Sequence, residues 1–195
     1  MQLGSRDSAL VERFLTGDVR AFDALVARHK ERVYSLIYRM TADREWAEDI
    51  TVEVFVEAYH SLPSFRRAAA FGTWLHRVAV NVCLEHLRRR KAKRQIQELQ
   101  LDGADVPSGP PVLEVIMTRQ LADQIVAAMQ ALPPAQRAAL SLFYLEERSH
   151  KEIAEILGIP KNTVKTRIFY GTRALRDQLQ AKGIISSPER YSGEV

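Results

Sequence analysis

Apolar side chains recur at helical spacing along most of the chain and predict a series of amphipathic helices. The first three are expected over residues 7–16, 18–40 and 44–62. The second has the clearest pattern, with one residue of its buried face every three or four positions: Phe22, Leu25, Val26, His29, Val33, Leu36, Ile37 and Met40. Strict alternation of apolar and polar residues, which is typical of strands, is nearly absent. We therefore predict an all-α fold.

A fourth and longer apolar pattern runs from residue 71 to about residue 99, and the periodicity stops after it. Residues 100–112 contain Gly, Pro, Ser and Asp without any period, which is the composition of a linker. Two more helices are expected over 113–131 and 135–145. We therefore predict two small helical domains joined by a flexible linker, with a C-terminal tail: in order, residues 1–95, 96–112, 113–182 and 183–195.

Residues 149–179 carry the signals of a helix-turn-helix. Ser149 and Glu152 have the spacing of a capping box, in which each side chain bonds a backbone N–H group of the first turn. Gly158 suits the left-handed backbone just past a helix end, and Pro160 favours the start of the next helix. The second helix places its apolar residues on one face: Val164, Ile168, Gly171, Leu175 and Leu179.

The polar faces of this second helix have the chemistry of a DNA-reading helix. Its start offers backbone N–H groups to a phosphate, and the next turn carries side chains that can reach base edges in a major groove. The candidates for this contact are Lys161, Asn162, Thr163, Lys165, Thr166, Arg167, Phe169, Tyr170 and Arg173. An ordinary helix pair with a solvated basic face is the alternative. The cap, the turn and the basic face together favour a DNA-binding helix-turn-helix.

The distribution of charge is more informative than the total, because the net charge is only +4 and the pI about 9.3. Residues 43–57 carry six acidic side chains and one basic one, whereas Arg66 to Arg94 contains nine Lys or Arg and one acid. The acidic helix is either a solvated face or a docking surface for a basic partner. The basic stripe lies near Phe65, Phe71 and Trp74 and suits single-stranded nucleic acid. For Trp74 a place in the core is favoured over base stacking.

Several function classes find no support in the sequence. Cys83 is the single cysteine, so an internal disulfide is excluded and a reducing compartment is indicated. Charged residues interrupt any N-terminal signal-peptide core, and no apolar run reaches the length of a membrane span, so we expect a cytoplasmic protein. Two Glu-x-x-His pairs, Glu57/His60 and Glu147/His150, fall in different predicted domains, which argues against a di-iron site. We predict a non-enzyme without a cofactor or metal.

Two blocks of sequence are more specific than a generic helix-turn-helix. The first reads AEDITVEVFVEAYHSLPSFR and continues with AFGTWLHRVAVNVCLEHLRRRKAKR after a short gap. The second reads LPPAQRAALSLFYLEERSHKEIAEILGIPKNTVKTRIFYGTRALRDQL. These blocks resemble regions 2 and 4 of bacterial RNA polymerase sigma factors of the sigma-70 superfamily, in its small extracytoplasmic-function (ECF) group.

The resemblance implies a subunit that binds core RNA polymerase, recognises −35 and −10 promoter elements and promotes transcription initiation. It implies that the acidic third helix docks on the clamp helices of the β′ subunit through Asp49, Val52, Glu53 and Phe55. It also implies that melted −10 DNA is held by Ser64, Phe65, Arg66, Arg67, Trp74, Arg77, Asn81, Arg88 and Arg89. The helix-turn-helix would read duplex DNA at −35 and meet the β flap with its other face. Many family members are held by an anti-sigma factor, so such a partner is implied as well.

The sequence departs from the family pattern at three places. Val52 stands where Gln is usual, and Asn162 stands where Gly is usual. The common Arg-Ala-Arg of the recognition helix is replaced by Tyr170-Gly171-Thr172, which removes two phosphate-seeking charges and adds a glycine that costs about 1 kcal/mol in a helix. A weaker or unusual −35 contact is therefore expected. The alternatives are a stand-alone helix-turn-helix regulator and a sigma-like protein-interaction adaptor.

Overall fold

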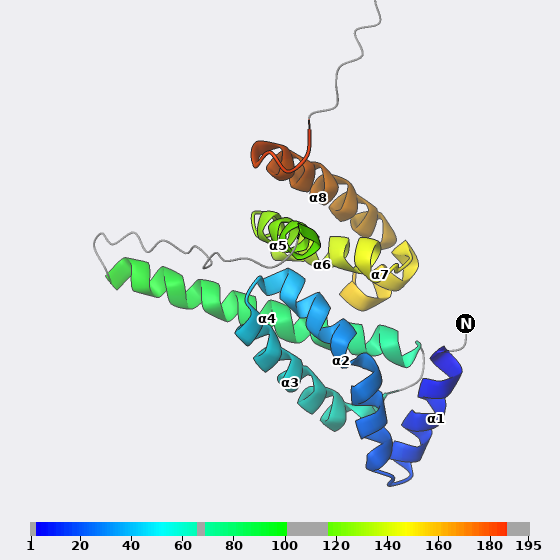
Figure 1. Cartoon of the computed structure of the whole chain (residues 1–195). Helices are drawn as coiled ribbons and strands as arrows, with labels where there is room; N and C mark the ends of the chain where they lie inside the picture. Colours follow the sequence, from blue (N-terminus) through cyan, green and yellow to red (C-terminus); the bar gives the residue numbers. More distant parts are fainter. Residues whose placement is uncertain (1–2, 66–68, 101–116, 187–195) are drawn as a thin grey trace, which may run out of the picture.

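The part of the chain that the structure describes folds into helices, and the predicted all-α class is confirmed. The structure is a computed structural model that describes residues 3–65, 69–100 and 117–186 (Figure 1). In chain order its elements are α1 (Leu3–Leu15), α2 (Arg20–Thr41), α3 (Arg44–Ser61), the 3-10 turn η1 (Leu62–Ser64), α4 (Phe71–Gln100), α5 (Met117–Met129), α6 (Pro134–Leu140), the π-helical turn η2 (Ser141–Leu145), α7 (His150–Leu157) and α8 (Lys161–Ala181).

The first half of the structure, α1 to α4, is a bundle around α2. Helix α2 packs against α1, α3 and α4, and its apolar face is buried as the sequence pattern predicts. The turn between α2 and α3 is fixed at both sides. Ala42 takes a left-handed backbone (φ 55°) and donates its N–H to Tyr38 O, while the Asp43 side chain accepts from Trp46 N–H at 3.1 Å. These two caps end one helix and begin the next within two residues.

The second half, α5 to α8, contains the predicted helix-turn-helix. The capping box is confirmed, because Glu152 N–H donates to Ser149 Oγ at 3.2 Å and Ser149 N–H donates to the Glu152 carboxylate at 2.9 Å. Gly158 has φ 62° and closes α7, and Pro160 precedes the first residue of α8. Val164 and Ile168 are buried on the inner face of α8. The recognition helix is therefore held with its polar faces outward.

The stretch predicted as one helix over residues 135–145 is divided in the structure. Helix α6 ends at Leu140, and the chain continues as the wider turn η2. Glu146 N–H donates to Ser141 O, five residues back, at 3.1 Å, and Glu147 then takes a left-handed backbone with φ 50°. The apolar spacing of an α-helix and of one π-helical turn is too similar for the sequence pattern to separate them.

Gly171 lies on the inner face that the sequence pattern predicts, and the structure shows which helix packs against it. A Cβ atom at this position would lie 3.2 Å from Leu140 Cδ1 and 3.5 Å from Gln136 Cβ. The missing side chain therefore allows α6 to lie close against α8. This contact gives a structural reason for a glycine that is unfavourable in a helix interior.

The two halves pack against each other. Helix α4 contacts α6 and α7, and α2 contacts α5 and α6, whereas α3 lies on the side of α2 and α4 away from the second half (Figure 1). One continuous apolar core includes Leu36 and Leu75 of the first half and Leu142 of the second. Arg137 of α6 is buried, which lowers the pKa of its guanidinium, and its Nη1 donates to Met40 O at 2.7 Å.

The predicted linker and tail lie largely outside the described residues. Residues 96–100 belong to α4, and residues 101–112 and 187–195 are not described. None of the helices in the described ranges has the length and apolar character needed to pass through a bilayer. Within the same ranges, His, Cys, Asp and Glu side chains form no group of three or more that could bind a metal ion.

We predict that Ser149→Ala lowers the free energy of unfolding by about 1 kcal/mol, because a backbone N–H group at the start of α7 loses its acceptor. Urea unfolding followed by circular dichroism measures the change. Ser186→Ala, at an exposed position after α8, is the matched control and should leave the midpoint unchanged. Equal midpoints for both variants would show that the cap contributes nothing.

Candidate nucleic-acid interface

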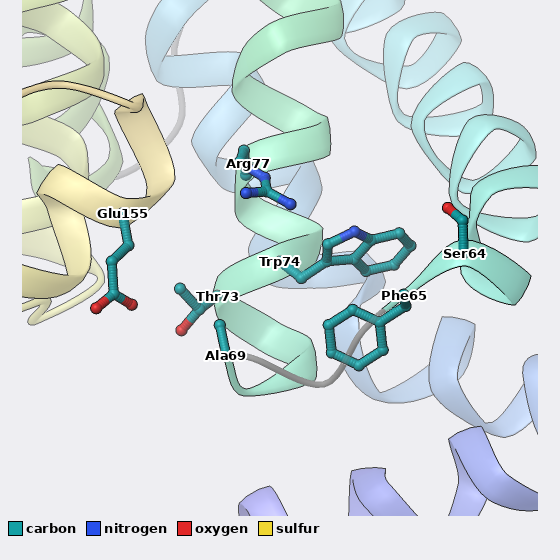
Figure 2. A pocket seen from close by; sticks show the side chains of 7 residues that line it. All are labelled: Ser64, Phe65, Ala69, Thr73, Trp74, Arg77 and Glu155. Atoms are coloured by element: carbon teal, nitrogen blue, oxygen red, sulfur yellow. The ribbon is translucent and has the colours of Figure 1, made fainter.

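A pocket of about 380 Å³ opens beside the N-terminal turns of α4 (Figure 2). Six of its lining residues come from the η1 loop and α4, and one comes from α7: Ser64, Phe65, Ala69, Thr73, Trp74, Arg77 and Glu155. The pocket thus combines aromatic rings, small polar groups, a cation and a carboxylate in the volume range of small-ligand sites. Predicted residues Arg66 and Arg67 lie outside the described residues.

The aromatic residues at the pocket form one packed group. The Phe65 ring lies 5.1 Å from the Trp74 ring and 6.4 Å from Phe71 between centroids, and Figure 2 shows Phe65 and Trp74 side by side. Trp74 is only 7% exposed and Phe71 only 4%, so the predicted core role of Trp74 is confirmed. Phe65 is half-buried at the rim. Phe65 and the accessible edge of Trp74 are thus the aromatic surface that the pocket offers to a base.

Basic and polar side chains continue from this pocket along α4. Arg77, Asn81 and Arg88 are exposed and follow the spacing of one helix face, since they are four and seven residues apart. Arg89 is also exposed, but it pairs with Glu85 at 2.5 Å across one turn. A nucleic-acid backbone could therefore follow α4 away from the pocket, with Arg77 at the pocket itself.

The recognition helix α8 presents most of its predicted contact residues to solvent. Thr163 and Arg167 are half-buried, and the others are exposed: Lys161, Asn162, Lys165, Thr166, Phe169, Tyr170 and Arg173. Phe169 is 65% exposed and its ring lies 5.3 Å from that of Tyr170. Within the described residues, no carboxylate lies at ion-pair distance from Lys165 or Arg167. This face of α8 therefore joins unpaired cations with two exposed aromatic rings.

A second hollow lies between α2 and α3, on the acidic side of the molecule. It has a volume of about 480 Å³ and is mainly apolar: its lining residues are Phe22, Val26, Lys30, Thr51, Val52, Phe55, Val56, Tyr59 and His60. Val52 is 64% exposed, whereas Phe55 is buried and lines the wall. Asp49 and Glu53 are exposed on the same helix. The four predicted docking residues thus combine an apolar groove with two carboxylates, one of which, Glu53, accepts from His86 at 2.7 Å.

Sequence reasoning missed two parts of these sites. The groove also needs Phe22, Val26 and Val56, which the apolar pattern assigned to helices without separating the groove from the core. The pocket also needs Glu155, which belongs to the other predicted domain. No local sequence signal connects Glu155 to α4, because only tertiary packing brings them together.

Comparisons with known proteins match both halves of the chain. The family model described as Sigma-70 region 2 matches residues 25–93, and that described as Sigma-70, region 4 matches residues 122–175. The RNA polymerase sigma-H factor of Pseudomonas aeruginosa is 36% identical over 182 residues, which cover 90% of this chain and 94% of that protein. The ECF RNA polymerase sigma factor SigW of Bacillus subtilis is 34% identical over 177 residues, covering 87% of this chain and 95% of that protein.

Solved structures share the fold at lower sequence identity. CnrH in complex with the cytosolic domain of CnrY has a TM-score of 0.68 and 22% identity, covering 90% of this chain and 98% of that one. The sigma factor RpoE in complex with the anti-sigma factor NepR from Bartonella quintana has a TM-score of 0.66 and 19% identity, covering 83% and 98%. Both likenesses concern the fold alone.

We predict that Arg77→Ala weakens binding of single-stranded DNA and lowers the slope of log K against log salt by about 0.7, the contribution of one phosphate contact on a single strand. Fluorescence anisotropy of a labelled oligonucleotide at several salt concentrations measures both quantities. Arg20→Ala removes an exposed arginine at the far end of α2 and is the control. An unchanged slope for Arg77→Ala would remove Arg77 from the interface.

Proposed function

This chain belongs to the sigma-70 family, in the group of ECF RNA polymerase sigma factors, and from this premise we propose how its surfaces divide the work of transcription initiation. Promoter recognition together with core RNA polymerase is the activity of the group. The first half, with the pocket and α4, would act on the −10 element, and the second half on the −35 element. We further propose that the chain has no catalytic chemistry of its own, needs no cofactor and acts in the cytoplasm.

The pocket beside α4 is proposed to receive an unpaired base of the melted −10 element. Flipping a base out of the stack costs a few kcal/mol, which aromatic contact and phosphate pairing can offset. Phe65 and Trp74 supply the aromatic contact, and Arg77 is the cation at the same opening. Asn81, Arg88 and Arg89 would then follow the backbone of the strand, with Ser64, Arg66 and Arg67 on the loop side.

The recognition helix is proposed to enter the major groove of duplex −35 DNA. Lys165, Thr166 and Arg167 lie within its first two turns, where a helix-turn-helix contacts base edges. Thr166 Oγ1 donates to Asn162 O at 3.0 Å, which orients the side chain along the helix. Phe169 and Tyr170 would make apolar contacts where the family usually has a further cation at position 170. We therefore propose a −35 contact with fewer phosphate bonds and more apolar surface than is usual in the group.

The groove between α2 and α3 is proposed to dock on the clamp helices of the polymerase β′ subunit. Val52 and Val56 leave an apolar strip open to solvent, which is typical of a surface that another protein covers. Asp49 and Glu53 on the same helix would select a basic partner surface and steer its approach. The β flap would meet the second half, and an anti-sigma factor would be a further partner, as in the RpoE–NepR complex of similar fold.

The observation that best supports this proposal is that three candidate surfaces occur together. An aromatic, cation-flanked pocket, an apolar and acidic groove, and a solvent-facing recognition helix occur in the same chain, on helices that match regions 2 and 4. A stand-alone regulator would use only the recognition helix and would leave the groove and the pocket without a partner.

Run-off transcription from a genomic DNA pool with purified core polymerase tests the proposal. We expect new transcripts that share −35 and −10 sequences when the chain is added. Arg167→Ala should reduce these transcripts about fivefold or more, because one good base contact contributes about 1–3 kcal/mol, and it should leave core binding in a pull-down intact.

Arg176→Ala, on an exposed turn further along α8, is the matched control for Arg167→Ala. If both variants transcribe like the native chain, Arg167 does not read the promoter. If the native chain yields no transcript and binds no core polymerase, the proposed function is wrong. A stand-alone helix-turn-helix regulator or a protein-interaction adaptor would then be the function to test.

We predict that Glu53→Lys has the opposite effect to Arg167→Ala: it weakens binding to core polymerase, while binding to duplex −35 DNA is retained. The reversed charge would repel a basic partner surface next to the apolar groove. Analytical gel filtration with core polymerase measures the loss, and thermal unfolding of the variant accounts for the lost bond to His86. Glu31→Lys, an exposed position on α2, should form holoenzyme normally. Normal holoenzyme with Glu53→Lys would contradict the docking assignment.

A further inference from the structure

Two of the three residues that replace the family's usual Arg-Ala-Arg in α8 are engaged within the protein. Gly171 is buried against α6, where a Cβ atom would lie 3.2 Å from Leu140 Cδ1. Thr172 is half-buried, and its Oγ1 shares a hydrogen bond of 3.2 Å with the hydroxyl group of Tyr144 in η2. Tyr170 is the exposed one of the three, at 55%. The change at position 170 is therefore the one that can alter what α8 recognises.

The Tyr170 ring packs against the ring of its neighbour Phe169. The two centroids lie 5.3 Å apart and the ring planes meet at 80°, which is the edge-to-face arrangement that aromatic pairs favour. Both residues are more than half exposed, so this contact leaves an apolar surface open to solvent. Adjacent residues of a helix point about 100° apart. The pair therefore spans the outer side of α8, opposite the buried Val164 and Ile168.

Cations surround this aromatic surface. Arg167 and Arg173 stand three residues before and three residues after Tyr170, at positions where side chains share a helix face. Asp177 is the single acid of α8, and it follows Tyr170 by seven residues, or about 10 Å along the helix axis. The charge around Tyr170 therefore suits a polyanion. Duplex DNA offers phosphates to the cations and base edges to the rings, and its major groove admits an α-helix.

The chemistry of a tyrosine ring limits which base edge it can recognise. Adenine, guanine and cytosine present hydrogen-bond donors and acceptors in the major groove, whereas thymine also presents its C5-methyl group, which apolar side chains contact. An arginine at position 170 would pair with phosphate, which carries no sequence information of its own. An aromatic ring at this position cannot form that ion pair, but it can cover a methyl group.

We propose that Tyr170, packed on Phe169, is a specificity-determining residue that contacts the C5-methyl group of a thymine in duplex −35 DNA. The proposal rests on the proposed function of α8, which it deepens by naming the base that is read. It exchanges a phosphate contact that is independent of sequence for a contact that depends on one base pair. Binding of this chain to its −35 element then depends less on salt, and more on one methyl group, than it would with arginine at position 170.

The first step of the test identifies the duplex that the full chain prefers. The chain, mixed with purified core polymerase and in parallel alone, selects from a random 30-base-pair duplex library made with thymine. The selected duplex is then remade with deoxyuridine in place of thymine, one position at a time, which removes only the methyl group. We expect at least one such exchange to weaken binding about threefold to fourfold in fluorescence anisotropy, the effect of one buried methyl group.

Variants at position 170 then assign this methyl effect. Tyr170→Phe keeps the ring and should keep the preference for thymine, whereas Tyr170→Ala should bind the two duplexes equally. Tyr170→Arg should also lose the preference, and it should steepen the slope of log K against log salt by about 0.9, the contribution of one phosphate contact on duplex DNA. Arg176→Ala, at an exposed position further along α8, is the control and should keep the native affinity and preference.

Three results would overturn the proposal. The first is a preference for thymine that persists unchanged in Tyr170→Ala, and the second is a selected duplex that tolerates deoxyuridine at every position. The third is the absence of any enriched duplex, which would leave an acidic protein surface as the partner to test. If the chain forms no complex with core polymerase but alone enriches a duplex whose thymine preference requires Tyr170, the inference is supported and the proposed function in transcription initiation is overturned.

Discussion

Short helices in this chain exist only because their apolar faces are buried against one another. Helix α7 has eight residues, which is too few for a helix that is stable alone in water. It is stabilised because its own side chains Ile153 and Ile156 are fully buried in the core. Its capping box and the left-handed Gly158 fix where it begins and ends, so the direction of α8 is fixed as well. The position of α8 therefore depends on the burial of α7 and of the inner face of α8. The outer face of α8 stays exposed to solvent.

The local structure could be predicted from the sequence, because its causes are local. Most of the helices, the Ser149 cap and the buried face of α8 follow from spacing within a few residues, whereas the π-helical turn η2 does not. The same is true of the exposed cations of α8. The junction between the halves could not be predicted in this way. Arg39 and Glu146 form a hydrogen bond across this junction, but they are 107 residues apart and neither stands in a motif that indicates the other.

The candidate binding surfaces could be predicted only in part from the sequence. The residues of the acidic helix were predicted from charge and resemblance, but the groove beside them depends on Phe22 and Val26 of another helix. Trp74 was expected in the core, and its burial is also what gives the pocket a fixed aromatic wall. Trp74 therefore belongs both to the hydrophobic core and to the lining of the pocket. Stability and recognition are thus connected at Trp74.

The close approach at Gly171 limits how the recognition helix can change over evolutionary time. The family's usual alanine at this position would bring a methyl group to 3.2 Å from the Leu140 side chain, which would have to move by a few tenths of an ångström. The common Arg-Ala-Arg at positions 170–172 would therefore fit only if the Leu140 side chain shifts or a smaller residue stands at position 140. The composition of the proposed DNA-contacting face of α8 is thus constrained by a buried residue of α6, and we expect the residues at positions 140 and 171 to vary together.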